Sequence, residues 1–547
     1  MTPHEELGNR RILKGLILSH PYAMLALLLV SLLGTVFSLA TPLGLGLLID
    51  KVLIGRNTTF LVPILFGLFV LFLVSALSNY LSNNIRGRLS LVLFKDLAYD
   101  LFGVIQDASF KDLQKIKTGD LLTRTIVNTN VAVQTITSIL PQIVVSVLSL
   151  ILPFLIMFSL NPTLAVISMS PVTLFIASSY YYGKKVKSFQ RHSLDLAASM
   201  NSFLKEAFSI VPLTKVFMLE QWMKNKFNDV MSEYYNASWD VVKVSSMSTS
   251  VGIIIYGIPT LLVLTFGSID VLNGSMSLGT FTVFVGYIGL FFSPVQIVSV
   301  SWANYKGSLA SFDRIGEIFL LKKESWGDKS LPKEISKIEF DEIDFSYNAR
   351  VIFSGFHATF MLGRNYLIGD NGSGKTTLIK LLCGLYRQDR GKILIDGVDH
   401  ISLSREALRK TISVVFSDAL IFDGTIYENI LVGDLSASQK EIMNAAKKAE
   451  LHDFVMTLPD QYETEVGESG LNLSSGEKQK IALARVILRN SPIIIFDEFT
   501  RSIDVDSKKS ILSVIKKMDN KIVIMITHDS NEIDRNSNLV NINNAPS

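Results

Sequence analysis

The sequence predicts a multi-domain membrane protein in which a six-helix, all-α transmembrane domain precedes an α/β domain. Two observations carry this prediction. Long stretches without a charged residue fill the chain up to Tyr305, and short apolar strands that alternate with helical stretches begin at Ile338. A bilayer core needs about 20 apolar residues per helix. Alternating strands and helices are typical of a sheet that is covered by helices.

The composition agrees with this division. The chain has 547 residues, of which 48% are hydrophobic and 18% charged, and this length allows two or three domains. The net charge of +3 is too small to predict nucleic-acid binding. Cys383 is the single cysteine, which excludes a disulfide within the chain and a cysteine zinc cluster, and we expect it to pack in a core. Because Cys383 lies in the second half, we also expect no leader-peptidase domain.

The charge-free stretches set the number of spans. The third stretch is far too long for one helix and contains Asn161-Pro162, so we expect it to hold two spans joined by a tight turn. Their continuously apolar pattern predicts helices, and the count is six spans. The five stretches are 21–49, 57–85, 125–183, 244–269 and 271–305.

Positive charge predicts the orientation of the spans. Residues 86–124 and 184–243 hold seven and nine Lys plus Arg, whereas the loops on the other face hold only Lys51 and Arg56. The positive-inside rule therefore places these segments, both termini and the second half of the chain in the cytoplasm, beneath the plasma (inner) membrane. We interpret the two segments as helices that extend out of the membrane. Their tips, near 110–120 and 206–216, are the expected contacts with the second half.

The middle of every span lacks ionisable side chains. Proton relays and ion-coupled transporters need such groups within the membrane, so these classes are disfavoured. The aromatic and polar side chains that remain, such as Tyr256, Gln296 and Trp302, can line a cavity for an amphipathic cargo. They suit membrane interfaces and helix contacts equally well.

The second half contains a phosphate-binding loop. Residues 366–368 are expected to form a strand, a helix is expected to follow, and the sequence GDNGSGKT between them fits G-x-x-x-x-G-K-[ST]. The glycines allow backbone N–H groups to turn inward around phosphate oxygens, Lys375 can reach the β- and γ-phosphates of ATP, and the Thr376 hydroxyl can bind Mg²⁺. The candidate nucleotide-binding residues of this loop are Gly369, Asn371, Gly372, Ser373, Gly374, Lys375, Thr376 and Thr377.

Two further strands end in residues that suit hydrolysis. The strand at 493–496 is followed by Asp497, a candidate Mg²⁺ ligand, and by Glu498, which is placed to orient and polarise the attacking water. The strand at 522–526 is followed by Thr527 and His528, and His528 can contact the γ-phosphate. Lys375, Glu498 and His528 are the candidate catalytic residues. Together these strand ends predict phosphoryl transfer to water by positioning and electrostatics.

A short motif carries a family resemblance. Residues 473–477 read LSSGE and are followed by a helical run at 478–489. The motif resembles the LSGGQ signature of ABC transporters, and the whole chain, with its membrane domain before its ATPase domain, is similar to the exporter type of that family. Residues 464–468, TEVGE, resemble a sequence typical of exporter ATPase domains. By this resemblance Tyr347 is the adenine-stacking aromatic residue and Asp504 is the D-loop aspartate.

The resemblance implies that the signature faces ATP held by an opposite subunit. A helix N-terminus suits a γ-phosphate because of its partial positive charge. ATP with Mg²⁺ would hold two ATPase domains together, hydrolysis would release them, and the cytoplasmic helix tips would pass this movement to the spans. The expected signature residues that contact nucleotide are Ser474, Ser475, Gly476 and Glu477.

The expected domain organisation follows from these assignments. A cytoplasmic segment covers 1–20, the transmembrane domain covers 21–320, a linker covers 321–335, and the ATP-binding domain with its helical subdomain covers 336–547. The expected partners are membrane lipid, an amphipathic small molecule, peptide or lipid as cargo, and a second copy of the chain. Nucleic acid is not an expected partner.

The sequence departs from the family at three places. Ser417 stands where the Q-loop usually has Gln, and Arg501 stands where the D-loop usually has Ser. In the signature, Ser475 replaces a Gly and Glu477 replaces the final Gln. Because the Q-loop Gln normally touches Mg²⁺ and links the ATPase domain to the membrane domain, either water or Asp418 fills in at Ser417, or coupling is weakened or re-routed.

Two other functions remain open at the level of sequence. One is a heterodimer in which a sister half-transporter carries a degenerate site. The other is an ATP-gated channel or a membrane-anchored ATPase that regulates partners. A P-loop kinase is disfavoured, because it would leave the signature motif unexplained. The identity of the cargo is not written in these motifs.

Overall fold

The computed structural model describes residues 15–542 apart from 333, 348–349, 468–469, 471, 500–504, 528–532 and 534–536. Of residues 292, 505–507 and 510 it describes the backbone only. The chain forms two compact units. The membrane unit comprises the chain up to Ile105 together with Lys117–Leu320. The α/β unit comprises Gln106–Ile116 and the chain from Leu321 onward.

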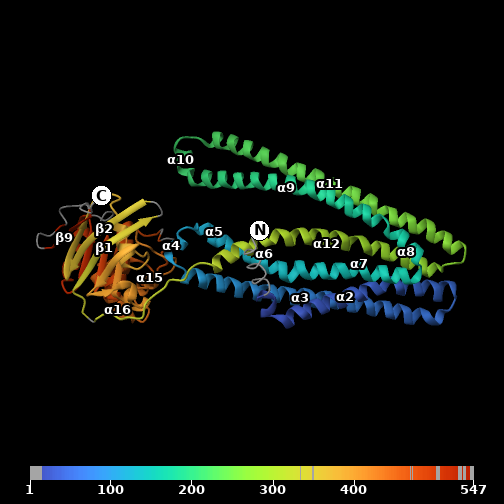
Figure 1. Cartoon of the computed structure of the whole chain (residues 1–547), viewed down its shortest axis with the longest axis horizontal. Helices are drawn as coiled ribbons and strands as arrows, with labels where there is room; N and C mark the ends of the chain where they lie inside the picture. Colours follow the sequence, from blue (N-terminus) through green and yellow to red (C-terminus); the bar gives the residue numbers. More distant parts are fainter. Residues whose placement is uncertain are drawn as a thin grey trace. The chain divides into compact units, whose positions relative to one another are not determined.

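Six spans form the membrane unit, as predicted (Figure 1). Among the described residues, these are the helices that are long and apolar enough to cross a membrane. They cover Pro21–Ile54, Thr58–Asp107, Thr118–Leu160, Pro162–Ser209, Glu220–Leu272 and Leu278–Phe319. Their elements are α2 (Pro21–Leu47), η1 (Leu48–Ile54), η2 (Thr58–Phe60), α3 (Leu61–Asp107), α5 (Thr118–Leu122), η3 (Thr123–Asn128), α6 (Thr129–Gln134), η4 (Thr135–Ile139), α7 (Leu140–Leu160), α8 (Pro162–Met169), α9 (Pro171–Ser209), α11 (Glu220–Leu272) and α12 (Leu278–Phe319), with α10 (Val211–Val216) at a cytoplasmic tip.

The charged segments are largely helical and continuous with the spans. The 47 residues of α3 measure about 70 Å at 1.5 Å per residue, more than twice the ~30 Å of a bilayer core. Helices α9 and α11 run side by side over their length (Figure 1), and the hydroxyls of Ser193 and Ser238 lie 3.0 Å apart between them. These helices are therefore longer than a bilayer core requires.

Side-chain caps hold the non-cytoplasmic ends of the spans. The predicted turn between the third and fourth spans lies at Asn161, whose side-chain oxygen accepts a hydrogen bond from the Leu164 N–H at 3.0 Å. Its amide nitrogen donates to Asp270 at 3.1 Å. Asp50 accepts hydrogen bonds from the Ser277 hydroxyl at 2.5 Å and from the Gly279 N–H at 2.7 Å, at the start of α12. The short connections are thus fixed by polar contacts between spans.

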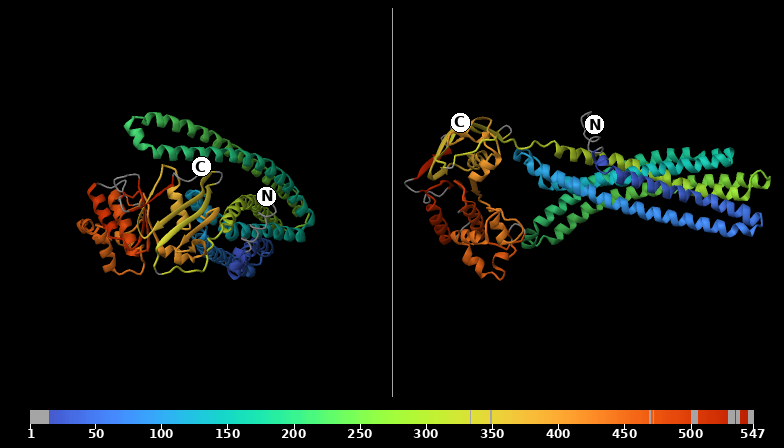
Figure 2. Two further views of the ribbon diagram at one scale, coloured as in Figure 1. Left: turned by 60° about the vertical axis from the view of Figure 1, so that its left-hand side comes forward. Right: turned by 90° about the horizontal axis from the view of Figure 1, so that it is seen from below.

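Two sheets form the centre of the α/β unit (Figure 2). Four antiparallel strands have the order β2-β1-β4-β5, and five parallel strands have the order β6-β7-β8-β3-β9. Strands β7 and β8 are buried along their whole length, as expected for branched side chains in a parallel sheet with both faces covered. The strands are β1 (Lys337–Tyr347), β2 (Arg350–Met361), β3 (Gly363–Ile368), β4 (Arg390–Ile395), β5 (Val398–Asp399), β6 (Ile412–Val415), β7 (Ile493–Asp497), β8 (Ile522–Ile526) and β9 (Asn538–Asn541).

The helices of the α/β unit begin at well-defined caps. Capping boxes begin the helices at Thr425, Ser438 and Ser474. In each, the hydroxyl of the first residue accepts a hydrogen bond from the N–H of a Glu three positions later, and that Glu side chain accepts one from the N–H of the first residue. Cys383 packs against the core of this unit, as expected. The helices are α4 (Phe110–Leu113), α13 (Lys375–Leu382), η5 (His400–Ser402), α14 (Arg405–Thr411), α15 (Ile426–Leu431), α16 (Gln439–Lys448), α17 (His452–Thr457), η6 (Gln461–Glu463), α18 (Ser475–Arg489) and α19 (Val505–Lys516).

Candidate nucleotide-binding site

The phosphate loop connects β3 to α13, in the strand-then-helix context that the sequence predicts. Gly372 and Gly374 have φ angles of +83° and +104°, which L side chains rarely adopt. A Cβ on Gly374 would also lie 2.7 Å from the Ile352 side chain and 2.8 Å from that of Phe353. Glycine at 374 is therefore required by both backbone conformation and space, and the loop can expose its N–H groups.

Lys375 is folded back over its own loop. Its ammonium donates to the backbone carbonyls of Gly369 at 2.6 Å and of Asp370 at 2.9 Å. Burial lowers the pKa of Lys375, and the nearby carboxylates of Glu498 and Asp497 oppose that shift. The side chain thus holds a partly desolvated positive charge at the loop, where weak carbonyl acceptors stand in the place of anionic oxygens.

Ser373 adds an unsatisfied hydroxyl to this loop. Its Oγ is buried and has no hydrogen-bond partner among the described atoms. A buried hydroxyl without a partner costs free energy unless a ligand or water binds it. An anionic ligand in the loop would supply acceptors for both Ser373 and Lys375, so the residues fit a phosphate.

Asp497 and Thr376 face each other at the end of β7. The Thr376 hydroxyl lies 3.5 Å from Asp497 Oδ2, which is long for a hydrogen bond. Asp497 is only 6% exposed, and burial, together with the charge of Glu498, raises the pKa of its carboxyl. Mg²⁺ takes oxygen ligands and is usually bound through one or two carboxylates plus phosphate and water, so these groups fit that ion. Among the described residues no cluster of three or more His, Cys, Asp or Glu side chains could hold a metal alone.

Glu498 sits in a strained backbone conformation. Its φ is +44°, in the left-handed region that non-glycine residues visit rarely. The Glu498 N–H donates to the Ile526 carbonyl of β8 at 3.2 Å, which fixes the residue at the edge of the sheet. Such strain persists where the surrounding structure over-determines a residue, and it often coincides with functional sites.

An aromatic cluster surrounds Tyr347 at the end of β1. The Tyr347 ring lies edge-on to Phe345 and Tyr386, with centroids 4.9 Å and 5.2 Å away. Tyr386 also meets Phe110 of α4 edge-on at 5.8 Å, and its hydroxyl donates to Gln114. Burial raises the pKa of Tyr386, so this phenol stays protonated as a hydrogen-bond donor. Sequence reasoning identified Tyr347 but missed Tyr386 and Gln114, because their contact spans 272 positions.

The signature opens α18. Ser474 is the N-cap, its Oγ accepts the Glu477 N–H at 3.3 Å, and Glu477 Oε2 accepts the Ser474 N–H at 2.6 Å. Ser475 and Gly476 form the first turn of the helix. The replacement of Gln by Glu at position 477 thus keeps the reciprocal cap, which either residue can make.

The structure places Ser417 against the signature helix through its backbone. The Ser417 carbonyl accepts a hydrogen bond from Gln479 Nε2 at 2.6 Å, and Gln479 is 2% exposed. The Ser417 side chain is exposed, so the backbone rather than the hydroxyl is what α18 holds. Farther along α18, Arg485 donates to the carbonyls of Leu420 and Asn429 and therefore fixes the same loop at a second point. No local pattern in the sequence predicts these contacts.

Four of the positions named from the sequence lie outside the described residues. They are His528, Asp504, the D-loop residue Arg501 and Glu468 of the TEVGE segment. The remaining predicted residues lie at the ends of β1, β3, β6 and β7 and at the starts of α13 and α18. Printed contacts bring Thr376 to Asp497 and Thr377 to Tyr347, whereas Ser417 contacts the signature helix. Asn371 lies in the turn of the phosphate loop, and Thr377 Oγ1 lies 3.5 Å from the Tyr347 hydroxyl.

Known proteins match both units. The family model described as the ABC transporter matches residues 359–501, and the one described as the ABC transporter transmembrane region matches residues 24–295. The putative multidrug export ATP-binding/permease protein YgaD of Bacillus subtilis is 29% identical over 523 residues, which cover 93% of this chain and 90% of YgaD. The uncharacterised ABC transporter ATP-binding protein YknV of the same organism is 30% identical over 510 residues, which cover 91% of this chain and 83% of YknV.

The fold matches a solved structure over nearly its whole length. A bacterial Atm1-family ABC exporter with ATP bound superposes with a TM-score of 0.81 at 22% sequence identity, over 95% of this chain and 93% of that one. The strand-then-helix setting of the phosphate loop and the helix that follows the signature agree with the expectations from the sequence. This chain belongs to the ABC transporter family: it is a multi-pass membrane exporter whose C-terminal, cytoplasmic ATPase domain couples ATP hydrolysis to transport.

Proposed function

We propose that this chain forms a homodimer that exports an amphipathic small molecule, peptide or lipid by alternating access. The observation that carries the proposal is that one chain holds both surfaces that a shared ATP site needs. A phosphate loop stands beside the Asp497–Glu498 pair, and a capped signature helix begins at Ser474. In a homodimer, the signature helix of each copy can therefore face the phosphate loop of the other copy.

Each residue at the phosphate loop has a role in this proposal. Lys375 exchanges its carbonyl partners for the β- and γ-phosphate oxygens, and the loop glycines leave room for the backbone N–H groups to donate to the same oxygens. Charge-assisted hydrogen bonds are about twice as strong as neutral ones, which favours this exchange. Ser373, buried without a partner, gains an acceptor. Tyr347 stacks on the adenine.

Thr376 and Asp497 would hold Mg²⁺, and the ion would supply positive charge to offset that of the phosphates. Asp497 must be a carboxylate for this role, and its buried position makes the charge costly until the ion is present. Glu498 orients and polarises the attacking water as a general base. The roles of His528 and Asp504 are assigned from their positions in the sequence motifs. His528 contacts the γ-phosphate, and Asp504 contacts the opposite subunit.

The spans suit an uncharged or amphipathic cargo. Their charge-free stretches offer no ionisable group for ion coupling, so ATP is the energy source. The similarity to YgaD, which is named for multidrug export, supports the same class of cargo. The proposed limits of the two domains are 21–320 and 336–547, with the linker 321–335 between them.

Reconstitution of the purified chain in liposomes tests the proposal. We expect the chain alone to release phosphate from MgATP, and one class in a panel of an amphipathic dye cation, a lysophospholipid and an amphipathic helical peptide to raise that rate. The same compound should accumulate inside vesicles whose ATPase domains face outward. Lys375→Ala is the matched control, because it removes the phosphate contact and should abolish both signals.

Other outcomes select the other functions. Phosphate release only after co-expression with a second half-transporter would establish a heterodimer. An ATP-dependent ionic current without accumulation of any compound would establish a channel. Phosphate release that no compound alters, together with no flux, would favour a regulatory ATPase.

A further inference from the structure

The start of the proposed linker is a strap with hydrogen bonds on both of its sides. Residues 322–329 pair on one side with residues 107–109 at the end of α3 and on the other with residues 402–404 before α14. Backbone bonds of this length on both sides leave the strap little freedom. The pairs are Ser109 N–H to Lys322 O at 2.8 Å, Glu324 N–H to Asp107 O at 3.0 Å, Gly327 N–H to Leu403 O at 2.9 Å and Lys329 N–H to Ser402 O at 3.0 Å.

Close packing reinforces these bonds. A Cβ on Gly327 would lie 1.9 Å from the Ser402 carbonyl oxygen, so only glycine fits there. The Trp326 ring packs against the core of the α/β unit, and a Cβ on Gly384 would lie 3.0 Å from it. The strap therefore moves with the surface on which it lies.

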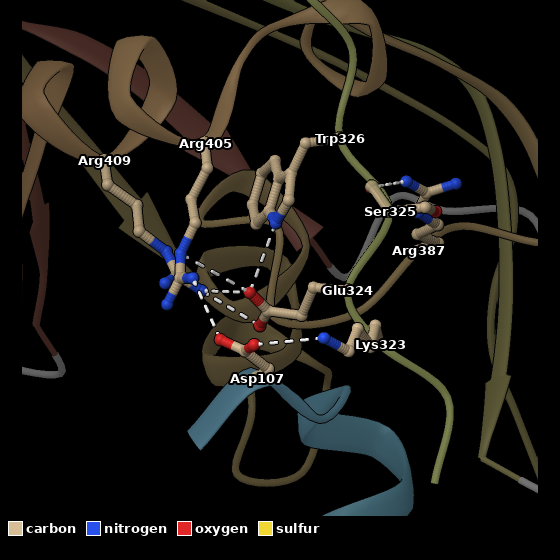
Figure 3. A network of polar contacts seen from close by, with 8 residues as sticks. All are labelled: Asp107, Lys323, Glu324, Ser325, Trp326, Arg387, Arg405 and Arg409. Carbon is tan, nitrogen blue, oxygen red and sulfur yellow. Dashed lines mark hydrogen bonds and ion pairs between the residues drawn. The ribbon is translucent and has the colours of Figure 1, made fainter. Parts of the chain in front are cut away.

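Glu324 is the centre of a polar network on this strap (Figure 3). Both of its carboxylate oxygens accept hydrogen bonds from Arg409 Nη2, at 2.8 Å and 2.9 Å, and one also accepts from the Trp326 indole at 3.3 Å. Glu324 is only 14% exposed, and the Arg409 guanidinium also lies over the Trp326 ring at 5.2 Å. With both carboxylate oxygens bound, this charge-assisted contact fixes the orientation of the Glu324 side chain more closely than a single exposed ion pair does.

The same network reaches the end of α3. Asp107, the last residue of α3, pairs with Lys323 at 3.4 Å and with Arg405 at 3.8 Å (Figure 3). Arg405 also lies 3.9 Å from Glu324. Two arginines of one short helix, α14, therefore hold both the strap that follows the sixth span and the end of the second span's helix.

The far end of the signature helix rests on α14. Arg489, the last residue of α18, donates to the Arg409 carbonyl, and the Ser491 hydroxyl donates to the Lys410 carbonyl at 3.0 Å. With 15 residues, α18 is a rigid rod of about 22 Å. One end of this rod is the signature at Ser474, and the other end contacts the residue whose guanidinium holds Glu324.

We propose that Arg409 is a positioning residue that joins the signature helix to the strap, so that movement of α18 reaches the second and sixth spans through α14. The inference rests on the proposed function, in which the signature meets nucleotide held by a second copy. It assigns a route that does not use the side chain at position 417, where this chain has Ser instead of the usual Gln. The route consists of the backbone contact of Arg489 to Arg409 and the side-chain contact of Arg409 to Glu324.

Hydrogen exchange of the full-length protein in lipid nanodiscs tests this route, with Mg²⁺ alone compared with MgATP plus orthovanadate. In the parent protein we expect nucleotide to slow exchange in peptides that cover 474–480 and also in those that cover 322–329 and 102–107. In Glu324→Gln and Arg409→Gln the signature peptides should respond as before, whereas the change in the strap should shrink by about three- to tenfold. Glu324→Gln keeps the size of the side chain and Arg409→Gln keeps a polar, though shorter, side chain, which favours folding.

Glu406→Gln is the matched control. Glu406 lies on the same helix and pairs with Lys410 at 2.6 Å, but both side chains are 75% exposed and neither contacts the strap. Its removal should leave every response unchanged. The double variant Glu324→Gln/Arg409→Gln should lose no more of the response than either single variant, since both remove one contact.

The outcomes separate this inference from the function on which it rests. A strap response that persists in both single variants, or losses that add in the double variant, would overturn the route. So would a parent protein in which the signature peptides respond and the strap does not. Absence of a response in the signature peptides of the parent would instead contradict the nucleotide-driven pairing of the proposed function.

Discussion

The phosphate end and the proposed base end of the ATP site, at Tyr347, are built in opposite ways. At the phosphate end Glu498 has a φ of +44°, Asp497 carries a buried carboxylate, and Ser373 has a hydroxyl without a partner. At the base end Tyr347 and Tyr386 pack edge-on at 5.2 Å, and the Tyr386 hydroxyl has its acceptor in Gln114. The first region contains strained or unpaired groups, whereas the named groups of the second region are paired.

This difference indicates where ligand binding changes the protein most. When phosphate and Mg²⁺ bind, the buried charges and unsatisfied donors acquire partners, which lowers the free energy of the bound state. The aromatic rings at the proposed base end already pack against one another, and by the proposal they contribute mainly shape and stacking. Substitutions at the phosphate end should therefore have larger effects on turnover than those at the base end.

The largest expected effect comes from Glu498→Gln. The change removes the general base but keeps the size of the side chain, and phosphate release by the reconstituted chain should fall by about 10²–10⁴-fold. Glu450→Gln is the matched control, because Glu450 has a φ of +55° on an exposed turn far from the loop in sequence. A loss of less than about tenfold in Glu498→Gln would remove Glu498 from the role of general base.

The next effect concerns Asp497→Asn and has opposite signs for turnover and stability. Without the carboxylate, Mg²⁺ affinity and hydrolysis should fall by at least about tenfold. In EDTA the variant should be more stable than the parent, with a Tm about 2–4 °C higher, because it no longer buries a charge. Phosphate release measures the effect on hydrolysis, and thermal unfolding followed by tryptophan fluorescence, with and without Mg²⁺, measures the effects on stability and on Mg²⁺ binding.

The pH dependence of that stability difference follows from the raised pKa of Asp497. A folded state with a raised carboxyl pKa binds its proton more tightly than the unfolded chain does. The parent therefore loses stability as pH rises from the ordinary pKa of Asp through the raised pKa of Asp497. The advantage of Asp497→Asn should be greatest at pH 7 and should disappear as pH falls toward the ordinary value for Asp of about 3.9. An advantage that grows on acidification would contradict a costly buried carboxylate.

The sequence predicts the parts of this molecule that depend on local pattern. The six spans, the turn at Asn161 and the strand-then-helix setting of the phosphate loop follow from hydropathy, a cap with a proline, and glycines at defined spacing. These signals are local because backbone geometry and water exclusion act over a few residues. The conformation of Glu498 was not predictable in this way, since no glycine marks its positive φ.

Contacts between distant segments could not be read from the sequence. Asp50 caps α12 across 229 positions, and Tyr386 meets Gln114 across 272. Ser417 is instructive, because comparison with the family considers only its side chain, whereas the structure holds its carbonyl through Gln479. Periodicity carries no information about such pairs.

A smaller effect is expected at the base end, from Tyr347→Leu. Loss of the aromatic face should weaken ATP binding by about tenfold, at the lower end of the ~1–3 kcal/mol of base stacking on an aromatic ring. Binding of inorganic tripolyphosphate should not change, because the phosphate loop is intact. Tyr347→Phe is the control and should bind ATP like the parent. Equal losses for ATP and tripolyphosphate in Tyr347→Leu would contradict a stacking role.

The smallest expected effect comes from Ser417→Gln, and it tests whether the side chain at 417 or the backbone contact to α18 matters. Because Gln479 binds the carbonyl of Ser417 and the side chain is exposed, the substitution should fit without loss of that bond. If coupling runs through α14, the ratio of cargo-stimulated to basal phosphate release should change by no more than about twofold, as for most exposed substitutions. A much larger change would show that the missing Gln had weakened coupling, and that the phosphate end reaches the membrane domain through this loop.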